Sequence, residues 1–427
     1  MTLNWTALDR IARHAGESFY LYWPEAYRQN HSALLKAFRQ IYPNTRLAHS
    51  YKTNYLPSVC RLADELGSYA EVVSELEYSM ALRFGVNPRR IIFNGPVKPK
   101  ADLVRALDDG SLVNIDNARE ARMITEYARG NAGRQISVGI RLNFDIGTNL
   151  ASRFGFDVDS DELMTVLRDM RGTPNCHVRG LHCHFSGARQ ATSFERRAAQ
   201  MIDLAAKLFP DSTPEYLDIG GGLCGVMGED MRSQLTYDAP TFRDYAEAAA
   251  GPFARRYESC CEVPLLIVEA GMALLSNVHE FVCRIQALKT IRGRRFAFCA
   301  GSIYNTQPLS RSIVLPITVV HARENHSEVT RMPITAIVGH TCMEIDVMHP
   351  GYEGAMGEDD FVVFPHTGAY TTVLTPPFIH PGPAIVEPTD NRGGYRLLRR
   401  RQTSDDVLAP YFIGDTPASQ TEAPLAI

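Results

Sequence analysis

The stretch "LAHSYKTNY", residues 47–55, decides the fold, because it ends a strand-like run on a lysine. With the two-residue period of a strand, Lys52 points to the same side as the small residues Ala48 and Ser50. Removing an ammonium group from water is costly unless another group uses it. Lys52 is therefore either an ordinary surface lysine at a strand end or a residue with a chemical role, and the rest of the sequence decides between these two interpretations.

The bulk composition is that of a soluble globular protein. The chain has 427 residues, too many for one ordinary core, which indicates one large domain and a smaller one. Hydrophobic residues make up 45%, charged residues 22% and the formal net charge is -4, so no basic excess is available for a nucleic-acid partner. The chain has no signal-like start, no apolar run near the ~20 residues that span a bilayer, and no CxxC pair among its nine cysteines. We expect a cytoplasmic protein with no membrane partner.

Short β-branched runs alternate with helix-like segments from residue 24 onward, which is the pattern of repeated β/α units. Eight such units are typical of a parallel (β/α)8 barrel, the TIM barrel, whose chemistry sits at the C-terminal ends of the strands. We predict this α/β barrel over residues 24–275. A single doubly wound sheet is the alternative, but it would leave the all-β last third of the chain as an appendage. The eight expected strands are 45–52, 69–73, 90–93, 111–115, 135–142, 177–184, 215–219 and 264–269.

A C-terminal β-sandwich or β-barrel-like domain is predicted over residues 276–400, because strand-like segments with turns replace the helical periodicity there. The early strand-like piece "SFYLYW", residues 18–23, could pair with this domain, so residues 1–23 are assigned to it as well. The end of the chain, residues 403–427, is predicted to be a disordered tail, since its last part is polar and rich in proline and alanine.

Polar residues and glycines end four of the expected strands. Lys52 ends the first strand, His184 ends the sixth in "GLHCHFSG", and Glu269 ends the eighth in "PLLIVEAG". Since the eighth strand lies beside the first in a closed barrel, Glu269 and Lys52 are expected on adjacent strands at one mouth. Three glycines follow the seventh strand in "YLDIGGG", where barrels commonly bind a phosphate through backbone amides. These glycines are Gly220, Gly221 and Gly222.

One cofactor explains this whole set of residues. Pyridoxal 5'-phosphate needs a lysine for a Schiff base, a cradle for its phosphate, a flat group against its ring and a carboxylate that keeps its pyridine nitrogen protonated. Lys52, the glycine run, His184 and Glu269 fit these four roles in that order. We therefore predict that Lys52 is paired with the aldehyde of the cofactor and not with a salt bridge.

A metal site is the main alternative. His182 and His184 are two residues apart on one face of the expected strand, as in barrel metallohydrolases. Such a site needs further histidine or carboxylate ligands at other strand ends, and Lys52, the glycine run and Glu269 supply little for it. We therefore expect no metal.

Eleven motifs occur in order between about residues 20 and 385. They are "YKTN", "GSYAEVVSELE", "RIIFNGPVKPKADL", "VNIDNARE", "GIRLN", "SRFGF", "GLHCHFSG", "LDIGGG", "EAG", "HTCMEID" and "GAYTTV". In these motifs the chain resembles the fold-type III pyridoxal-phosphate-dependent decarboxylases, the group of diaminopimelate, ornithine and arginine decarboxylases, with alanine racemase a more distant relative. Eleven ordered matches are far more specific than any one of them.

The resemblance implies roles for further residues. Tyr370 of "GAY" and Ser186 would hold the phosphate, and Arg141 of "GIRLN" would belong to the cofactor-binding residues. Cys342 of "HTC" would reach the active site of the other subunit in a homodimer and protonate the substrate carbon after carbon dioxide leaves. A racemase would protonate without losing carbon dioxide, and the carboxylate of Glu269 argues for decarboxylation. A non-catalytic relative that binds the cofactor or a partner and regulates is the third class, which release of carbon dioxide would distinguish.

The chain departs from the family pattern at several positions. The arginine expected near the phosphate is Met272 in "EAGM", and the serine of "HFSG" precedes its glycine. The segment "TQPLS" stands where an arginine-bearing segment meets a distal carboxylate. The acidic residue that grips the distal amine of diaminopimelate or ornithine is Met343. These losses argue against the simple primary-metabolism substrates.

The segments "EAGMALL" and "GSIYN" are similar to those of decarboxylases in siderophore and other specialised pathways, whose amino acid substrates carry a bulky acyl group. We therefore predict a small-molecule substrate that is an acylated or conjugated diamino acid, bound by Met343, Tyr304 and Glu344. A free diamino acid such as diaminopimelate, ornithine or lysine is the alternative.

Overall fold

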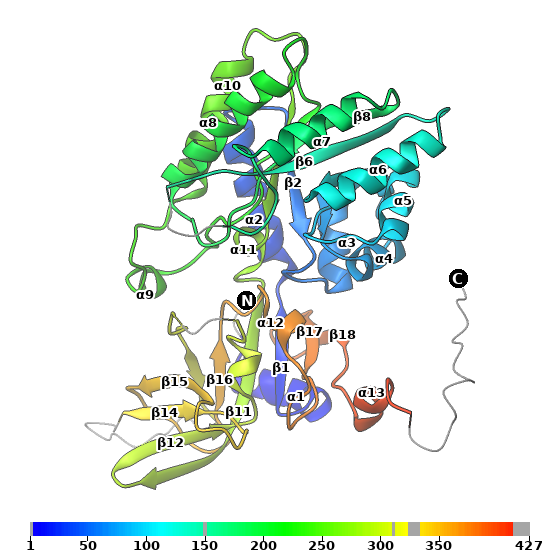
Figure 1. Cartoon of the computed structure of the whole chain (residues 1–427). Helices are drawn as coiled ribbons and strands as arrows, with labels where there is room; N and C mark the ends of the chain where they lie inside the picture. The colour runs from blue at the N-terminus through cyan, green and yellow to red at the C-terminus, as the bar shows by residue number, and fades with distance from the viewer. Residues whose placement is uncertain (1–2, 148–151, 310–311, 323–333, 413–427) are drawn as a thin grey trace.

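The computed structural model describes residues 3–147, 152–309, 312–322 and 334–412 (Figure 1). Two sheets organise them, a closed parallel barrel and a separate mixed sheet. In Figure 1 the barrel and its helices occupy the upper part of the molecule, and the mixed sheet lies below them. Within the described residues, no helix combines the length and the apolar character that crossing a bilayer requires.

Eight parallel strands form the barrel in the order β5-β4-β3-β2-β10-β9-β8-β6, and the pairing of β5 with β6 closes it. Each strand lies within two residues of its expected bounds, because strands covered on both faces read as short aliphatic runs. The predicted TIM barrel is confirmed, and the doubly wound sheet is wrong. The barrel strands are β2 (Thr45–Ser50), β3 (Tyr69–Val72), β4 (Ile91–Phe93), β5 (Leu112–Ile115), β6 (Ile136–Asn143), β8 (Cys176–His182), β9 (Tyr216–Asp218) and β10 (Leu265–Ala270), with the short β7 (Phe156–Asp157) added beside β6.

Helices follow the barrel strands and surround them (Figure 1). Capping side chains fix where several of them begin. Ser74 accepts the amide of Glu77 at the start of α4, and Thr241 and Asp244 form a capping box at the start of α10. The helices are α2 (Pro24–Arg39), α3 (Pro57–Glu65), α4 (Glu75–Arg83), α5 (Lys100–Asp108), α6 (Ala118–Gly130), α7 (Asp161–Arg171), α8 (Ala191–Leu208) and α10 (Phe242–Tyr257), with the short η1 (Pro88–Arg90), α9 (Glu229–Arg232) and α11 (Met272–Leu275) between elements.

The second sheet is built from nine strands and includes the N-terminal one. β1 pairs antiparallel with β11 and parallel with β17, so the start of the chain lies inside this sheet. Helix α1 (Trp5–Ala15) packs its buried side against β1, with Leu8, Ile11 and Phe19 in one apolar cluster. The strands are β1 (Ser18–Tyr22), β11 (His279–Ile291), β12 (Arg294–Cys299), β13 (Thr318–Val320), β14 (Thr335–Val338), β15 (Val347–Tyr352), β16 (Phe361–Phe364), β17 (Ala384–Pro388) and β18 (Tyr395–Arg399), with η2 (Ile303–Asn305) and α12 (Thr371–Leu374) between them.

The segment predicted as a tail contains a helix. Helix α13 (Ser404–Leu408) begins at a capping box of Thr403 and Asp406, and Asp406 also pairs with Arg400. The prediction of disorder over residues 403–427 is therefore wrong for the first part, because capping and an ion pair support a turn of helix without a core. Residues 413–427 lie outside the described residues.

Hydrogen bonds to backbone carbonyls hold the second sheet's loops on the barrel mouth. The amide of Tyr370 donates to the carbonyl of Thr53 at 2.8 Å, and Asn54 Nδ2 donates to the carbonyl of Gly368 at 2.9 Å. A Cβ on Gly368 would lie 2.0 Å from the carbonyl oxygen of Leu275, so only glycine allows this close approach. These contacts carry Tyr370 to the C-terminal end of the barrel.

Candidate active site

Lys52 follows β2, and the next strand supplies a carboxylate that holds its ammonium. Lys52 Nζ lies 2.8 Å from both carboxylate oxygens of Glu71. Ser50, opposite Glu71 in the register of β2 and β3, donates to the same carboxylate at 2.5 Å. Burial lowers the pKa of Lys52, but the carboxylates of Glu71 and Glu269 outweigh burial and raise this pKa above its usual range. Lys52 thus makes a salt bridge with Glu71 that the sequence did not predict, and its pairing with the aldehyde of the cofactor stays a prediction.

Glu269 lies on β10, which pairs with β2 in the closed barrel. Asn94 Nδ2 donates to Glu269 at 2.5 Å and to Glu71 at 3.3 Å, so one amide bridges the two carboxylates. His182 Nε2 lies 3.5 Å from Glu269 Oε1. Burial raises the pKa of Glu269, but His182 and Lys52 outweigh burial and lower this pKa below its usual range. Glu269 is therefore ionised throughout the physiological pH range.

His184 follows β8 and faces the same cavity. Its Nδ1 accepts the amide of Gly221 at 3.0 Å, so this nitrogen carries no proton. Burial and the charge of Lys52 lower the pKa of His184 well below its usual value, which makes the imidazole neutral. Arg141 donates to the carbonyl of His184 at 3.3 Å and pairs with Asp116 at 3.0 Å. Arg141 therefore lies behind His184 and is not among the described residues that line the cavity.

The glycine run makes a turn that requires glycine. Gly220 and Gly222 have φ values of +67° and +99°, and a Cβ on Gly221 would lie 2.4 Å from the carbonyl oxygen of Glu269. The amides of Gly222 and Leu223 donate no hydrogen bond within the described parts of the chain, and both residues line the cavity. Unpartnered amides in a glycine turn are a cradle that fits the phosphate of pyridoxal phosphate.

One cavity at the barrel mouth brings together most of the predicted cofactor residues. Tyr370 enters it at the start of α12, with a left-handed backbone at φ +63°. Met272 also lines it, so the position at which the resemblance leads us to expect an arginine does face the cavity. Gly220 and Arg141 lie behind its wall. The predicted residues that line it are Lys52, His184, Ser186, Gly221, Gly222, Glu269 and Tyr370.

The predicted catalytic cysteine and the residues predicted to bind the substrate lie elsewhere in a single chain. Cys342, Met343 and Glu344 are exposed in the loop between β14 and β15. Tyr304 lies beside them, with its hydroxyl 3.8 Å from the sulfur of Met343. Among the residues that the structure describes around the cavity of Lys52, none of these four appears. One chain alone does not bring them to Lys52.

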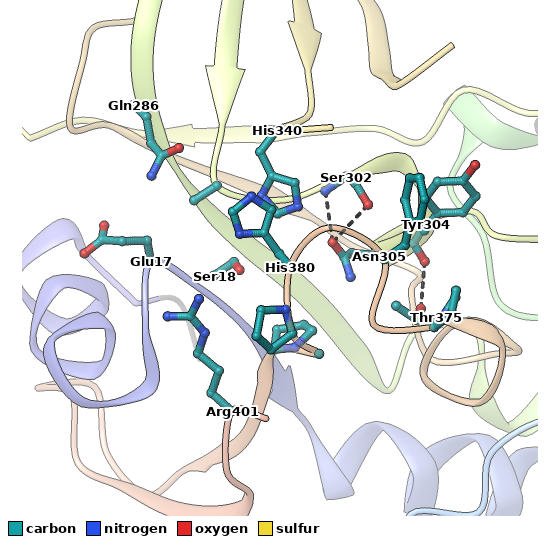
Figure 2. Close-up of a pocket in the computed structure, with 16 residues that line it drawn as sticks. Glu17, Ser18, Gln286, Ser302, Tyr304, Asn305, His340, Thr375, His380 and Arg401 are labelled. Carbon is teal, nitrogen blue, oxygen red and sulfur yellow. Dashed lines mark hydrogen bonds between the residues drawn. The ribbon is translucent and has the colours of Figure 1, made fainter. Parts of the chain in front are cut away.

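Tyr304 lines a second pocket, in the mixed sheet (Figure 2). Its ring meets Phe378 edge-on with the ring centres 5.9 Å apart, and its carbonyl accepts the Thr375 hydroxyl at 2.7 Å. His340 and His380 lie against each other in the same pocket, with ring centres 3.8 Å apart. Burial and the neighbouring His380 lower the pKa of His340 to about 4, so this imidazole is neutral at physiological pH. The pocket borders the exposed loop that begins just after His340.

A compact buried cluster would suit a cation in the metal alternative. His182, Asp218 and Glu269 offer ligand atoms that all lie within 4.8 Å of one another, and His184 is not one of this group. Burial and the charge of Glu269 raise the pKa of Asp218 well above its usual value, so this carboxyl is neutral. A metal would have to displace that proton, because carboxylate ligands bind in their ionised form. Without a metal ion, Asp218 therefore keeps a proton beside the ionised Glu269.

The sequence reasoning missed the polar layer inside the barrel. Asn114 donates to Asn94 at 2.8 Å, and Tyr216 donates to Asn114 at 2.6 Å, which extends the network that begins at Glu71. The signal available in the sequence was Glu71, a charged residue within a short apolar strand. Burying a charge costs free energy unless another group pairs with it. Arg189, which lines the cavity, was also missed, and its surface-like sequence context gave no signal.

A closed parallel barrel whose strand ends gather a lysine, a carboxylate, a neutral imidazole and a glycine cradle defines a pyridoxal-phosphate-dependent enzyme of the TIM-barrel class. Residues 29–276 match the family model described as pyridoxal-dependent decarboxylase, pyridoxal binding domain. The chain belongs to this family, the fold-type III decarboxylases, and its cofactor is pyridoxal 5'-phosphate. The predicted family, cofactor and enzyme class are confirmed.

Similar proteins include several diaminopimelate decarboxylases. That of Aquifex aeolicus is 24% identical over 422 residues, covering 95% of this chain and 94% of that protein. A probable chloroplastic diaminopimelate decarboxylase of Oryza sativa is 30% identical over 297 residues, covering 67% of this chain and 57% of that protein. The crystal structure of the M. jannaschii diaminopimelate decarboxylase has a TM-score of 0.83 at 23% identity and covers 96% of this chain and 95% of its own. This structural likeness shows the shared fold.

Proposed function

We propose that this decarboxylase acts on an amino acid whose distal nitrogen is acylated or conjugated, in siderophore or other specialised biosynthesis. Met343 carries the proposal. Its side chain is 36% exposed beside the Tyr304 hydroxyl, at the position where the resemblance leads us to expect a carboxylate for a distal amine. A thioether cannot neutralise an ammonium group, but it packs readily against an acyl group.

The active site in this proposal is shared between the two subunits of a homodimer. Cys342, Met343 and Glu344 are exposed on one loop, and a single chain leaves them away from the described wall of the Lys52 cavity. In a dimer, this loop of one chain would enter the Lys52 cavity of the other. The exposed side chains of Cys342, Met343 and Glu344 would then contact the substrate. The partner's surface and the loop would then form one substrate pocket.

Each residue of the cavity has a different role in the proposed reaction. Bound pyridoxal phosphate supplies an electron sink for the electron pair that the leaving carboxylate releases. Glu269 is ionised and would accept the pyridine N–H of the bound cofactor, which would keep that nitrogen protonated. Glu71 stabilises the protonated amine of Lys52 while that amine is not bonded to the cofactor. Cys342, from the other subunit, would donate a proton to the substrate carbon after carbon dioxide leaves, and His184 would supply a flat face for the cofactor ring.

A free diamino acid is the second candidate substrate. Glu344 is an exposed carboxylate next to Met343, and it offers a counter-charge for a distal ammonium one residue along the loop. The relatives named diaminopimelate decarboxylase support the same candidate. The choice between the two substrate classes therefore depends on whether Glu344 or Met343 contacts the distal nitrogen.

Release of carbon dioxide from purified protein tests the proposal. Free lysine, ornithine and diaminopimelate are compared with versions of the same amino acids acylated on the distal nitrogen. Turnover of the acylated compounds with weak turnover of the free ones is the expected result. Efficient turnover of a free diamino acid would favour the second candidate, and no carbon dioxide from any compound would favour a non-catalytic, regulatory relative.

The cytoplasmic location remains a prediction from the sequence.

A further inference from the structure

The cavity that holds the cofactor is short of positive charge. The phosphate of pyridoxal phosphate carries close to two negative charges at neutral pH, and Met272 leaves it without the arginine that the resemblance leads us to expect. Among the described residues that line the cavity, the arginine and lysine side chains are only Lys52 and Arg189. Lys52 pairs with Glu71 and serves the aldehyde, so its charge is not available to the phosphate. Arg189 is the remaining cation.

Arg189 has a free side chain on a fixed backbone. The residue is half-buried, and its guanidinium makes no hydrogen bond or ion pair with any residue that the structure describes. Its carbonyl accepts the hydroxyl of Tyr245 at 2.5 Å, from helix α10. A half-buried arginine that lines a cavity without a partner is unusual, because its guanidinium offers five donors and a permanent charge. The side chain is thus available for an anion that enters the cavity.

A second arginine fixes the loop of Arg189 against the glycine cradle. Arg197, fully buried on α8, donates to the carbonyl of Gly221 at 2.8 Å. Its other terminal nitrogen donates to the carbonyls of Phe185 and Ala188, each at 3.1 Å. One rigid guanidinium therefore holds both the turn that carries the free amides and the residue directly before Arg189. The backbone of Arg189 is therefore fixed relative to the cradle, while its side chain stays free.

We propose that Arg189 binds the phosphate of pyridoxal phosphate and replaces the missing arginine at Met272. The amides of Gly222 and Leu223 supply neutral donors, and Arg189 supplies the charge. The inference rests on the cofactor assignment and on no particular substrate. A carboxylate of the substrate is the other anion that this arginine could meet, so the test is made without substrate.

The experiment measures cofactor binding to the apoprotein. The apoprotein is titrated with pyridoxal phosphate and, separately, with pyridoxal, which has the aldehyde but no phosphate, and the change in visible absorbance is followed. In Arg189→Gln we expect the Kd of pyridoxal phosphate to rise about 10- to 100-fold, as for the loss of one charged hydrogen-bond partner, with the Kd of pyridoxal unchanged. Arg243→Gln, which removes an exposed arginine paired with Glu247 on α10, is the matched control and should change neither constant.

Two further variants and a competitor sharpen the result. Met272→Arg in the Arg189→Gln background should recover part of the affinity, because it returns a cation to the same cavity. Inorganic phosphate should compete with pyridoxal phosphate in the unmodified protein and compete less well in Arg189→Gln.

Three outcomes would overturn the inference. Equal weakening of pyridoxal phosphate and pyridoxal would make Arg189 a structural residue. No change in either constant would place the counter-charge elsewhere. Failure of the unmodified apoprotein to bind either compound would overturn the cofactor assignment itself, which is a different result from a change confined to Arg189→Gln.

Discussion

Lys52 Nζ lies equally close, at 2.8 Å, to the two carboxylate oxygens of Glu71 on the neighbouring barrel strand. The contact keeps the amine protonated, although only the neutral amine can attack an aldehyde. Ser50 and Asn94 also donate to Glu71, so the carboxylate is fixed before the cofactor arrives. We therefore expect Glu71 to control when Lys52 becomes reactive.

Glu71→Gln should shift the pH dependence of cofactor attachment to lower pH. The carboxylates of Glu71 and Glu269 raise the pKa of Lys52 against the opposing effect of burial. With Glu71 neutral, burial counts for more, the pKa of Lys52 falls, and the neutral amine is populated at lower pH. The rate of covalent attachment to the apoprotein, measured from pH 6 to pH 10, checks this. An unchanged profile would show that the ion pair does not control the amine.

Asp218→Asn should leave the protein at least as stable as the parent at neutral pH. The folded-state pKa of Asp218 is raised, so above the unfolded-state value folding must keep a proton on a group that would ionise in the unfolded chain. This cost is present at neutral pH and disappears as the pH falls below the unfolded-state pKa. Asparagine removes the cost and keeps an acceptor for the amide of Gly220, which donates to Asp218 at 2.9 Å.

Urea unfolding of both proteins between pH 4 and pH 8 tests this prediction. The stability difference in favour of Asp218→Asn should be largest at the high end and shrink toward the low end. A variant that is less stable at pH 8 and equal at pH 4 would show that Asp218 is ionised in the folded protein.

Cys342→Ala should keep the cofactor and lose roughly a hundredfold or more in turnover, as for removal of a general acid. Cys342 is exposed and lies outside the described wall of the Lys52 cavity, which fits the proposed dimer, in which it serves the site of the other subunit. Equimolar mixing of Cys342→Ala with Lys52→Ala should therefore restore roughly a quarter of the parental activity, since half of the sites in half of the dimers have both residues intact. Visible absorbance and carbon dioxide release are measured on the same samples. No recovery after subunit exchange would contradict the shared site.

Met343→Glu should raise turnover of free lysine or ornithine about fivefold or more and lower turnover of an acylated substrate. The side chain is 36% exposed in a single chain, so solvent screens the new ion pair and limits the gain. Met343→Leu is the matched control, because it keeps the volume without adding charge. Efficient turnover of free diamino acids by the parent protein would remove the reason for this prediction.

The barrel could be predicted from the sequence because its strands are short apolar runs at regular spacing. Lys52 and Glu269 could be placed on adjacent strands because closure of a barrel brings its first and last strands together. Glu71 could not be assigned, since alternation along a strand does not say which of its two faces points into the barrel. In the proposed dimer the placement of Cys342 depends on a second subunit, which no pattern within one chain describes. Helix α13 was missed because its support is a capping box and one ion pair, not an apolar stripe.

The central claim is that Lys52 carries pyridoxal phosphate at the mouth of the barrel. Its most direct test is the visible absorption spectrum of the purified protein, recorded with its zinc content, beside Lys52→Arg, which keeps the positive charge next to Glu71 but forms no Schiff base. We predict a band near the visible edge in the parent protein, fixation of the cofactor on Lys52 by borohydride, and no band in Lys52→Arg. A colourless parent protein with stoichiometric zinc, held by His182, Asp218 and Glu269, would contradict the account.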